Sequence, residues 1–378
     1  MEHIIKFYPV GNADCTLIKL DNGMTIIVDC QILDDLTDGH GKPIAFDVKA
    51  DLLKELKKDS EGRPFVDLFI STHPHDDHCK GFGANFYHGS ANDYDKDKNK
   101  DQIIVNEMWI TPRGLKIELA DTAVDIRQEA KRRRELYDKS PTFGGGYGDY
   151  LRIIGYDKNK DFDKRYCYVP GTTVSSVHSA ELEWLEIFIH APFKEDVEMS
   201  KKYDDKNATS IVVQLGFKIS GIAGFRSKVL LCGDAEHDIW QHIIDNNKDD
   251  DKLKWNIFLA PHHCSWSFFN EANNKKEILP SAEKILGMQI GDKAHIIASS
   301  NEIKDDDNNP PCYEAKKEYI SHLVKKDAHF LNTAVYRPLG GIPQPIVFII
   351  DETGKRLKDS SLAAGASSIS RPAPRAGK

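Results

Sequence analysis

Short apolar runs separated by turn residues open the chain. Residues 3–10, 15–20 and 24–30 read HIIKFYPV, CTLIKL and MTIIVDC, with GNAD and DNG between them. Runs of β-branched and apolar side chains separated by Gly, Asn and Asp are typical of strands joined by short turns. We therefore expect three consecutive strands at the start of the chain.

A helix and a buried strand are expected next. The segment DVKADLLKELKKD at residues 47–59 carries apolar side chains spaced along one helical face, namely Val48, Leu52, Leu53 and Leu56. Residues 64–72 (PFVDLFIST) then form a nearly continuous apolar run, which is typical of a strand buried on both faces. This run leads directly into the polar sequence THPHDDH, so that sequence is expected in a loop at the end of a strand.

The segment at about residues 88–180 differs in character from the rest of the chain. It contains polar low-complexity stretches, an arginine-rich helical pattern (DIRQEAKRRRELYDK) and a glycine run (FGGGYGDY). We interpret it as an insertion. Strand-like runs and helical patterns return after it, whereas residues 357–378 are small, Pro-containing and aperiodic. The sequence thus predicts one domain over residues 1–356, interrupted by the insertion, and a disordered tail over residues 357–378.

Composition and charge exclude several classes of protein. No stretch of the 378 residues approaches the roughly 18 consecutive apolar residues that span a bilayer, and the start lacks a basic segment before an apolar run. The seven cysteines are scattered and never form CxxC, which argues against a disulfide framework and a Cys-type zinc knuckle. We therefore expect a soluble, cytoplasmic protein with no membrane association.

The net charge restricts how nucleic acid could bind. The chain has 51 Lys+Arg residues against 59 Asp+Glu residues, a formal charge of −8. A chain of this charge must bind nucleic acid through a local basic surface rather than through its overall field.

The strongest chemical signal is the sequence HPHDDH at residues 73–78. It places His73, His75, Asp77 and His78 within six residues at the end of a strand. Neutral imidazoles and carboxylates are the ligands of zinc and related divalent ions. The spacing allows His73 and His75 to reach one metal while Asp77 and His78 turn toward a second.

Two later strand ends carry further ligand candidates. The run KVLLCGD ends in Asp234, whose carboxylate could bridge two metals, although a strand ending in Gly-Asp is more often only a turn. The run FLAPHHCS ends in His262 and His263. One of these could ligate the second metal and the other could donate a hydrogen bond to an anionic substrate.

The order of these three clusters resembles the metallo-β-lactamase fold superfamily, in the branch related to the metallo-hydrolase domain of the competence protein ComEC. The opening element of that branch is matched by VGNADC at residues 10–15, and its strand ending in I-D is matched by residues 27–29. Its Asn-x-x-Ser element is matched by residues 207–210, and its H-H-G-S element by residues 262–265, with Cys264 in place of glycine. The likeness runs from about residue 3 to residue 356.

The resemblance implies an α/β fold of the layered α+β kind, a four-layer αββα sandwich. It also implies two divalent ions, zinc or manganese, and hydrolysis of a phosphodiester, ester or amide by a metal-bridging hydroxide. The implied ligands are His73, His75, Asp77, His78, Asp234 and His263, the last favoured over His262 because it precedes the family's glycine. Asp29, Asn207 and Ser210 would support the ligands without binding the metals, with Asn207 standing where other branches have an additional histidine.

Catalytic roles follow from the same resemblance. Asp77 would both ligate a metal and orient the hydroxide, and His262 or Lys80 would face the leaving oxygen. The family's Gly-Gly after the first motif is replaced here by Cys79-Lys80-Gly81. Lys80 could contact an anionic substrate or could point to solvent.

The arginine-rich helical pattern within the insertion has two interpretations. Its cations could track a phosphate backbone beside the active site, or they could form a solvated helix face paired with Glu129 and Glu135. The residues concerned are Arg127, Lys131, Arg132, Arg133 and Arg134.

The leading functional hypothesis is a dinuclear phosphodiesterase, with nucleic acid as substrate. A second hypothesis keeps the metals and changes the substrate to a small ester, lactone or phosphoester. A third is a partner-gated effector or regulatory subunit of a bacterial defence or stress system, with protein partners bound through the insertion.

Overall fold

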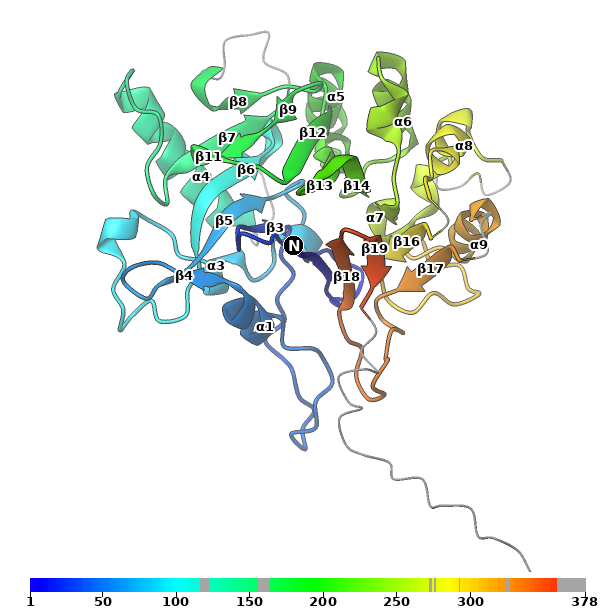
Figure 1. The fold of residues 1–378 in the computed structure, drawn as a ribbon, viewed down its shortest axis with the longest axis horizontal. Helices are drawn as coiled ribbons and strands as arrows, with labels where there is room; N and C mark the ends of the chain where they lie inside the picture. Colours follow the sequence, from blue (N-terminus) through cyan, green and yellow to red (C-terminus); the bar gives the residue numbers. More distant parts are fainter. Residues whose placement is uncertain are drawn as a thin grey trace, which may run out of the picture.

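Two large β-sheets form the centre of the structure (Figure 1). The computed structural model describes residues 1–358 except 116–122, 156–163, 272–273, 275–276, 292 and 324–326. Of the tail expected over residues 357–378, all but the first two residues lie outside this described part.

The first sheet runs in the order β19-β18-β1-β2-β3-β5-β6-β7-β8, and β4 pairs with β5 at its side. The opening of the chain forms the three expected strands, which pair antiparallel, and β1 also pairs with β18 near the other end of the described chain. The strands of this sheet are β1 (His3–Phe7), β2 (Thr16–Lys19), β3 (Thr25–Val28), β4 (Lys57–Lys58), β5 (Pro64–Ile70), β6 (Ile104–Ile110), β7 (Tyr150–Ile154), β8 (Cys167–Tyr168), β18 (Ile346–Asp351) and β19 (Gly354–Leu357).

The second sheet runs in the order β17-β16-β15-β14-β13-β12-β9. Its strands from β14 to β17 are parallel to one another, and the others pair antiparallel. The strands are β9 (Thr173–Val174), β12 (Leu185–Ala191), β13 (Val212–Ile219), β14 (Ile222–Leu231), β15 (Ile257–Leu259), β16 (His295–Ala298) and β17 (His329–Asn332); β10 (Ser176–Val177) and β11 (Ala180–Glu181) form a separate pair.

Helices connect and flank the strands (Figure 1). The helix expected over residues 47–59 is present as α1 but ends earlier, at Glu55. The α-helices are α1 (Val48–Glu55), α2 (Asp76–Cys79), α3 (Phe82–Asn85), α4 (Val124–Lys139), α5 (Lys194–Tyr203), α6 (His237–Asn246), α7 (Pro261–Cys264), α8 (Pro280–Gly287) and α9 (Tyr313–His322).

Each sheet carries apolar side chains on both of its faces. One buried cluster joins strands of the two sheets to each other, as with Ile5 and Leu68 of the first sheet and Ile187 and Val229 of the second. Two further clusters join the other face of the first sheet to α1 and α4, and the other face of the second sheet to α6, α8 and α9. The fold is therefore mixed α and β, of the α+β kind that the sequence predicted.

The segment interpreted as an insertion contributes to this architecture. Within residues 88–180, β6, β7 and β8 extend the first sheet beyond β5, and α4 buries Ile126, Ala130 and Tyr137 against it. Within the described part of the chain, no helix has both the length and the apolar character needed to cross a membrane.

A substitution at a buried position of β1 tests the packing of the first sheet. Ile5 is fully buried and pairs with Ile18 of β2 and Phe348 of β18. We expect Ile5→Ala to lower the free energy of unfolding by about 2–5 kcal/mol, because it removes buried methyl groups and leaves a cavity. Denaturant unfolding should show this loss, and Ile320→Ala on α9, where the residue is 48% exposed, should change stability by no more than about 0.5 kcal/mol. Equal stabilities for the two variants would contradict the placement of Ile5 in the core.

Candidate metal centre

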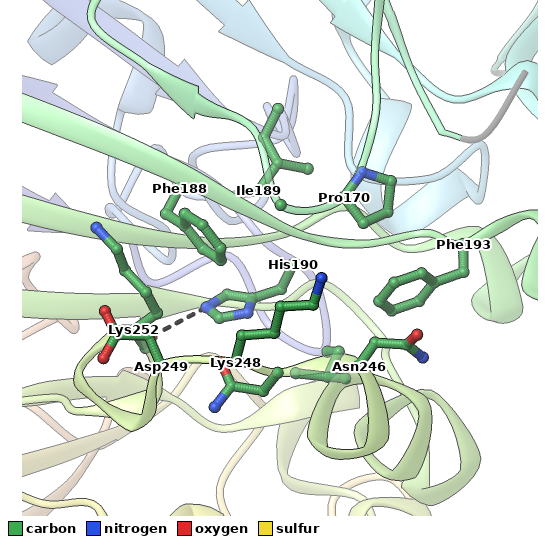
Figure 2. A pocket seen from close by; sticks show the side chains of 12 residues that line it. Pro170, Phe188, Ile189, His190, Phe193, Asn246, Lys248, Asp249 and Lys252 are labelled. Atoms are coloured by element: carbon green, nitrogen blue, oxygen red, sulfur yellow. Dashed lines mark hydrogen bonds between the residues drawn. The ribbon is translucent and has the colours of Figure 1, made fainter.

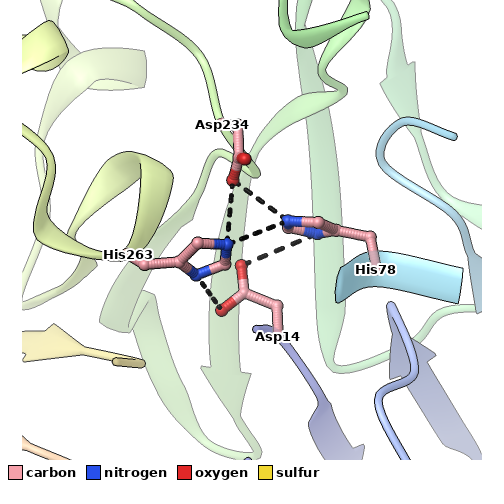
Figure 3. Close-up of side chains that lie close together, drawn as sticks. All are labelled: Asp14, His78, Asp234 and His263. Carbon is pink, nitrogen blue, oxygen red and sulfur yellow. Dashed lines mark hydrogen bonds and ion pairs between the residues drawn. The ribbon is translucent and has the colours of Figure 1, made fainter. Parts of the chain in front are cut away.

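The histidine and aspartate candidates come together where strand ends of the two sheets meet. The first motif follows β5; it was expected in a loop, but its second half forms the short helix α2. Asp234 follows β14, and the paired histidines lie in α7 after β15. Figure 3 shows Asp234 and His263 from the second sheet facing His78 of α2 and Asp14 of the loop before β2. Neither sheet alone supplies the whole set.

Four of these side chains form a first group, in which Asp14, His78, Asp234 and His263 could hold a metal ion. The Nε2 atoms of His78 and His263 lie 3.3 Å apart. Oδ1 of Asp234 lies 3.0 Å from Nε2 of His78 and 3.6 Å from Nε2 of His263. All four residues are buried.

A second group consists of His73, His75 and Asp234. Nε2 of His73 lies 3.5 Å from Oδ2 of Asp234 and 3.1 Å from Nδ1 of His75. Asp234 therefore turns one carboxylate oxygen to each group. The sequence predicted His73 and His75 at one site and Asp77 and His78 at a second. His73 and His75 do share a group and His78 belongs to the other, but that group is completed by Asp14 and not by Asp77.

The two imidazole rings of the first group are held by hydrogen bonds from Nδ1. Nδ1 of His78 donates to Oδ2 of Asp29 at 2.7 Å, and Nδ1 of His263 donates to the backbone carbonyl of Ser299 at 3.1 Å. A carbonyl can only accept, so the proton of a neutral His263 is on Nδ1. In the neutral form of each ring, Nε2 then turns its lone pair toward Asp234.

The resulting set of atoms fits a divalent cation. Two imidazole lone pairs and Oδ1 of Asp234 converge in a buried space, and this oxygen has no hydrogen-bond partner among the described residues. Electron-rich atoms brought this close without water repel one another unless a cation or proton lies between them. Nitrogen and oxygen donors of this kind suit zinc and manganese.

Asp77, His262 and His263 take different places in the centre. Oδ2 of Asp77 lies 3.2 Å from Nε2 of His263, and its side chain is 35% exposed, at the open side of the first group. His262 turns Nε2 toward Oδ2 of Asp234 at 3.7 Å, and its Nδ1 lies 3.3 Å from Oε1 of Glu236 and 3.1 Å from Oγ of Ser267. The structure thus brings His263 into the first group and leaves His262 beside it.

Left-handed backbone conformations shape the two later loops. A Cβ on Gly233, whose φ is +48°, would come within 2.8 Å of Oγ1 of Thr72, so no larger residue fits there. His262, His263 and Cys264 all have positive φ, and that of Cys264 is +68°. Glycine adopts this conformation most readily, so Cys264 stands at a position that favours glycine.

The supporting residues named from the sequence lie next to the ligands. Asp29 accepts hydrogen bonds from the backbone N and Oγ1 of Thr72 in addition to His78, so it ties the first motif's loop to the end of β3. Oγ of Ser210 accepts from the backbone N of Asp234 at 3.1 Å. Nδ2 of Asn207 donates to Oε1 of Glu236 at 3.4 Å, and its buried Oδ1 has no partner in the described chain.

The centre sets the protonation of its own residues. Burial, together with the neighbouring His78, lowers the pKa of His73 to about 3. Burial alone would lower the pKa of His78, but the carboxylates of Asp234 and Asp29 raise it well above its usual value. Burial would likewise raise the pKa of Asp234, but the surrounding histidines hold it well below the ordinary range. Without metal, protons on histidine thus take the place of the cation.

Four contributors to the centre were missed as functional residues. Asp14 lies within the matched opening element but was not named as a ligand candidate. Glu236 and Lys206 were not singled out; Lys206 lies close enough to His75 to help burial lower its pKa. Ser299 acts through its backbone carbonyl, which no side-chain pattern can reveal.

The remaining sequence candidates lie away from the ligands or are engaged elsewhere. Lys80 is exposed after α2 and makes no side-chain hydrogen bond or ion pair with any described residue. Arg127 and Arg133 of α4 are buried, and Arg133 donates to the carbonyls of Val105 and Tyr150. Arg132 and Arg133 both pair with Glu129 at 2.7 Å. Their contacts fasten α4 within the protein.

A separate cavity of about 490 Å³ lies beside α6 and β12 (Figure 2). His190 in its wall donates from Nε2 to the backbone carbonyl of Lys252 at 3.0 Å, and Phe188 and Phe193 supply apolar surface. None of the residues that line it belongs to the two metal-binding groups. The cavity is therefore not part of the metal centre.

No protein-family model matches the chain, and no curated protein matches it. The functional argument therefore rests on the geometry of the site.

Asp29 offers a test of how the centre is held. We expect Asp29→Asn to lower metal affinity about 10–100-fold, because the amide orients and polarises His78 less well than the carboxylate. Competition with a zinc-binding dye would measure the affinity. The exposed Asp35→Asn makes the same charge change away from the centre and should leave affinity unchanged. The assignment fails if the two variants bind zinc equally well.

Metal binding should also release protons. Neighbouring carboxylates raise the pKa values of His78 and His263 against the effect of burial, which favours protonated rings in the metal-free protein. A coordinating Nε2 must be deprotonated, so metal affinity should fall as the pH drops below these raised values. Calorimetric titration at pH 7 in buffers of different ionisation enthalpy would count the protons. Identical apparent enthalpies in all buffers would argue against protonated ligands.

Proposed function

We propose that the chain is a metal-dependent hydrolase of the metallo-β-lactamase type, with a four-layer αββα fold. The observation that carries this proposal is that Asp234 divides its two oxygens between a group containing His73 and His75 and a group containing His78 and His263. The apolar clusters on both faces of both sheets support the layered arrangement.

The chemistry of such a centre is hydrolytic. Two divalent ions held by these residues would lower the pKa of water and stabilise negative charge on the reacting group. Asp77, on the open side of the first group, is placed to orient the attacking water by accepting its hydrogen bond.

His262 is proposed to supply a proton to the leaving oxygen. Burial would lower its pKa, but Asp234 and Glu236 raise it, which favours the protonated ring. Its side chain is 20% exposed, so a substrate can reach it. A protonated imidazole held by Glu236 and Ser267 is suited to general acid catalysis.

The proposed substrate is a phosphodiester, with nucleic acid as the leading candidate. Lys206 lies near enough to His75 to help lower its pKa. An ammonium group beside a metal centre favours an anionic substrate. The substrate proposal thus depends on Lys206 and not on Lys80 or the arginines of α4.

Metal analysis combined with a substrate panel tests the reaction class. Wild-type protein should bind two metals per chain and cleave DNA, RNA or bis(p-nitrophenyl) phosphate. Asp77→Ala should retain the fold and lose about 10²–10⁴-fold in kcat/KM, the range for removal of a positioned acid–base group. The exposed Asp35→Ala serves as control. A wild-type protein that is fully loaded with metal and leaves every phosphodiester intact would refute the proposal.

Leaving-group dependence separates the role of His262 from that of His263. His262→Ala should keep its metals and lose about 10²–10⁴-fold in kcat on DNA or RNA, whose leaving oxygen needs a proton. It should lose much less on bis(p-nitrophenyl) phosphate, because nitrophenolate leaves unprotonated. His263→Ala should instead lose metal and fail on both substrates. Equal losses of His262→Ala on both substrates would rule out proton donation.

A further inference from the structure

A second cavity lies at the opposite end of the second sheet from the metal centre. The strands β15, β16 and β17 are parallel, and His263 and Ser299 follow the ends of β15 and β16. His295 and His329 instead stand at the starts of β16 and β17, and β19 lies beside them (Figure 1). The cavity has a volume of about 390 Å³ and is lined by Lys293, His295, Asp327, His329, Lys355, Arg356 and Leu357.

Positive charge in this cavity is only partly compensated. Arg356 pairs with Asp351 at 3.2 Å and with Glu2 at 3.1 Å. Lys293 and Lys355 form no ion pair with any residue in the described part of the chain, and Asp327 is the one carboxylate among the lining residues. The cavity therefore holds two lysines that have no ion-pair partner among the described residues.

The contacts of His295 are in conflict. This residue is 4% exposed, and its Nδ1 lies 2.8 Å from the backbone carbonyl of Lys293 and 2.6 Å from Nζ of Lys355. The carbonyl requires a proton on Nδ1, whereas an ammonium group requires a lone pair there. One nitrogen cannot satisfy both partners while Lys355 is charged.

The effect on protonation agrees with this conflict. Burial, together with Lys293, lowers the pKa of Lys355 to about 7. Burial, together with Lys355, lowers the pKa of His295 to about 3. Both groups thus favour the neutral form, as expected where a binding partner of opposite charge is missing.

We propose that this cavity binds a small phosphorylated ligand, with Lys355 and Lys293 contacting its phosphate. An anion near Nζ of Lys355 would draw the ammonium away from His295, and Nδ1 of His295 could then donate to the carbonyl of Lys293 alone. Lysine is a common phosphate-binding residue. The volume is at the lower end of the roughly 300–1,000 Å³ of small-molecule sites, and Leu357 adds apolar surface, so the ligand is a small phosphomonoester and not a nucleic-acid strand.

Calorimetric titration of the full chain with inorganic phosphate and with glycerol 3-phosphate tests the proposal. The titration is done after chelation, so that phosphate cannot bind at a metal. Wild-type protein should show one saturable site for both probes, with affinity at least about 10-fold weaker in Lys355→Met. Lys98→Met removes an equal charge from a side chain that is 83% exposed, and it should bind like wild type.

Several results would overturn the proposal. Equal phosphate affinity in wild type and Lys355→Met would show that phosphate binds elsewhere. Absence of saturable binding in the millimolar range would show that the cavity is not a phosphate site. If the protein bound an oligonucleotide without terminal phosphates but bound neither small probe, a small ligand would be ruled out. If Lys355→Met does not fold, Lys293→Met at an exposed position provides the same comparison. None of these results depends on the proposed hydrolase activity.

Discussion

The structure of the candidate centre depends on one constraint, the convergence of electron-rich atoms on the buried carboxylate of Asp234. His78 and His263 approach one of its oxygens, and His73 approaches the other. In a buried space, such a set is stable only when cations or protons separate its members. The raised pKa of His78 and the depressed pKa of Asp234 are the response of the metal-free protein to this constraint.

Both sheets are needed to build this arrangement. The first motif belongs to a loop of the first sheet, and Asp234 and His263 follow strands of the second, so the apolar cluster between the sheets fixes the distance between the two halves of the site. Asp29 and the carbonyl of Ser299 then fix the ring orientations. Packing thus sets where the ligands are, and hydrogen bonds set which atoms they present.

The sequence predicted the residues of the centre better than their interactions. The HPHDDH motif, Asp234 and His263 could be identified because imidazoles and carboxylates clustered at strand ends have few other uses. Asp14 lay within the matched opening element, but its distance in the sequence from the other ligands concealed its role. Ser299 could not be identified, because it acts through its backbone. The arginines of α4 had two interpretations, a basic face or a face paired with Glu129, and the structure pairs Arg132 and Arg133 with Glu129. Arg133 also donates to the carbonyl of Val105, a contact that a helical pattern does not specify.

At the two ends of β16, the same interaction, a hydrogen bond from histidine Nδ1 to a backbone carbonyl, can favour ligands of opposite charge. At its carboxyl end, the carbonyl of Ser299 holds Nδ1 of His263, and the ring faces the carboxylate of Asp234. At its start, the carbonyl of Lys293 holds Nδ1 of His295, and the ring meets the ammonium of Lys355. In each case a backbone carbonyl fixes the tautomer of a buried histidine beside a charged side chain. The sign of that charge would favour a cation at one end and an anion at the other.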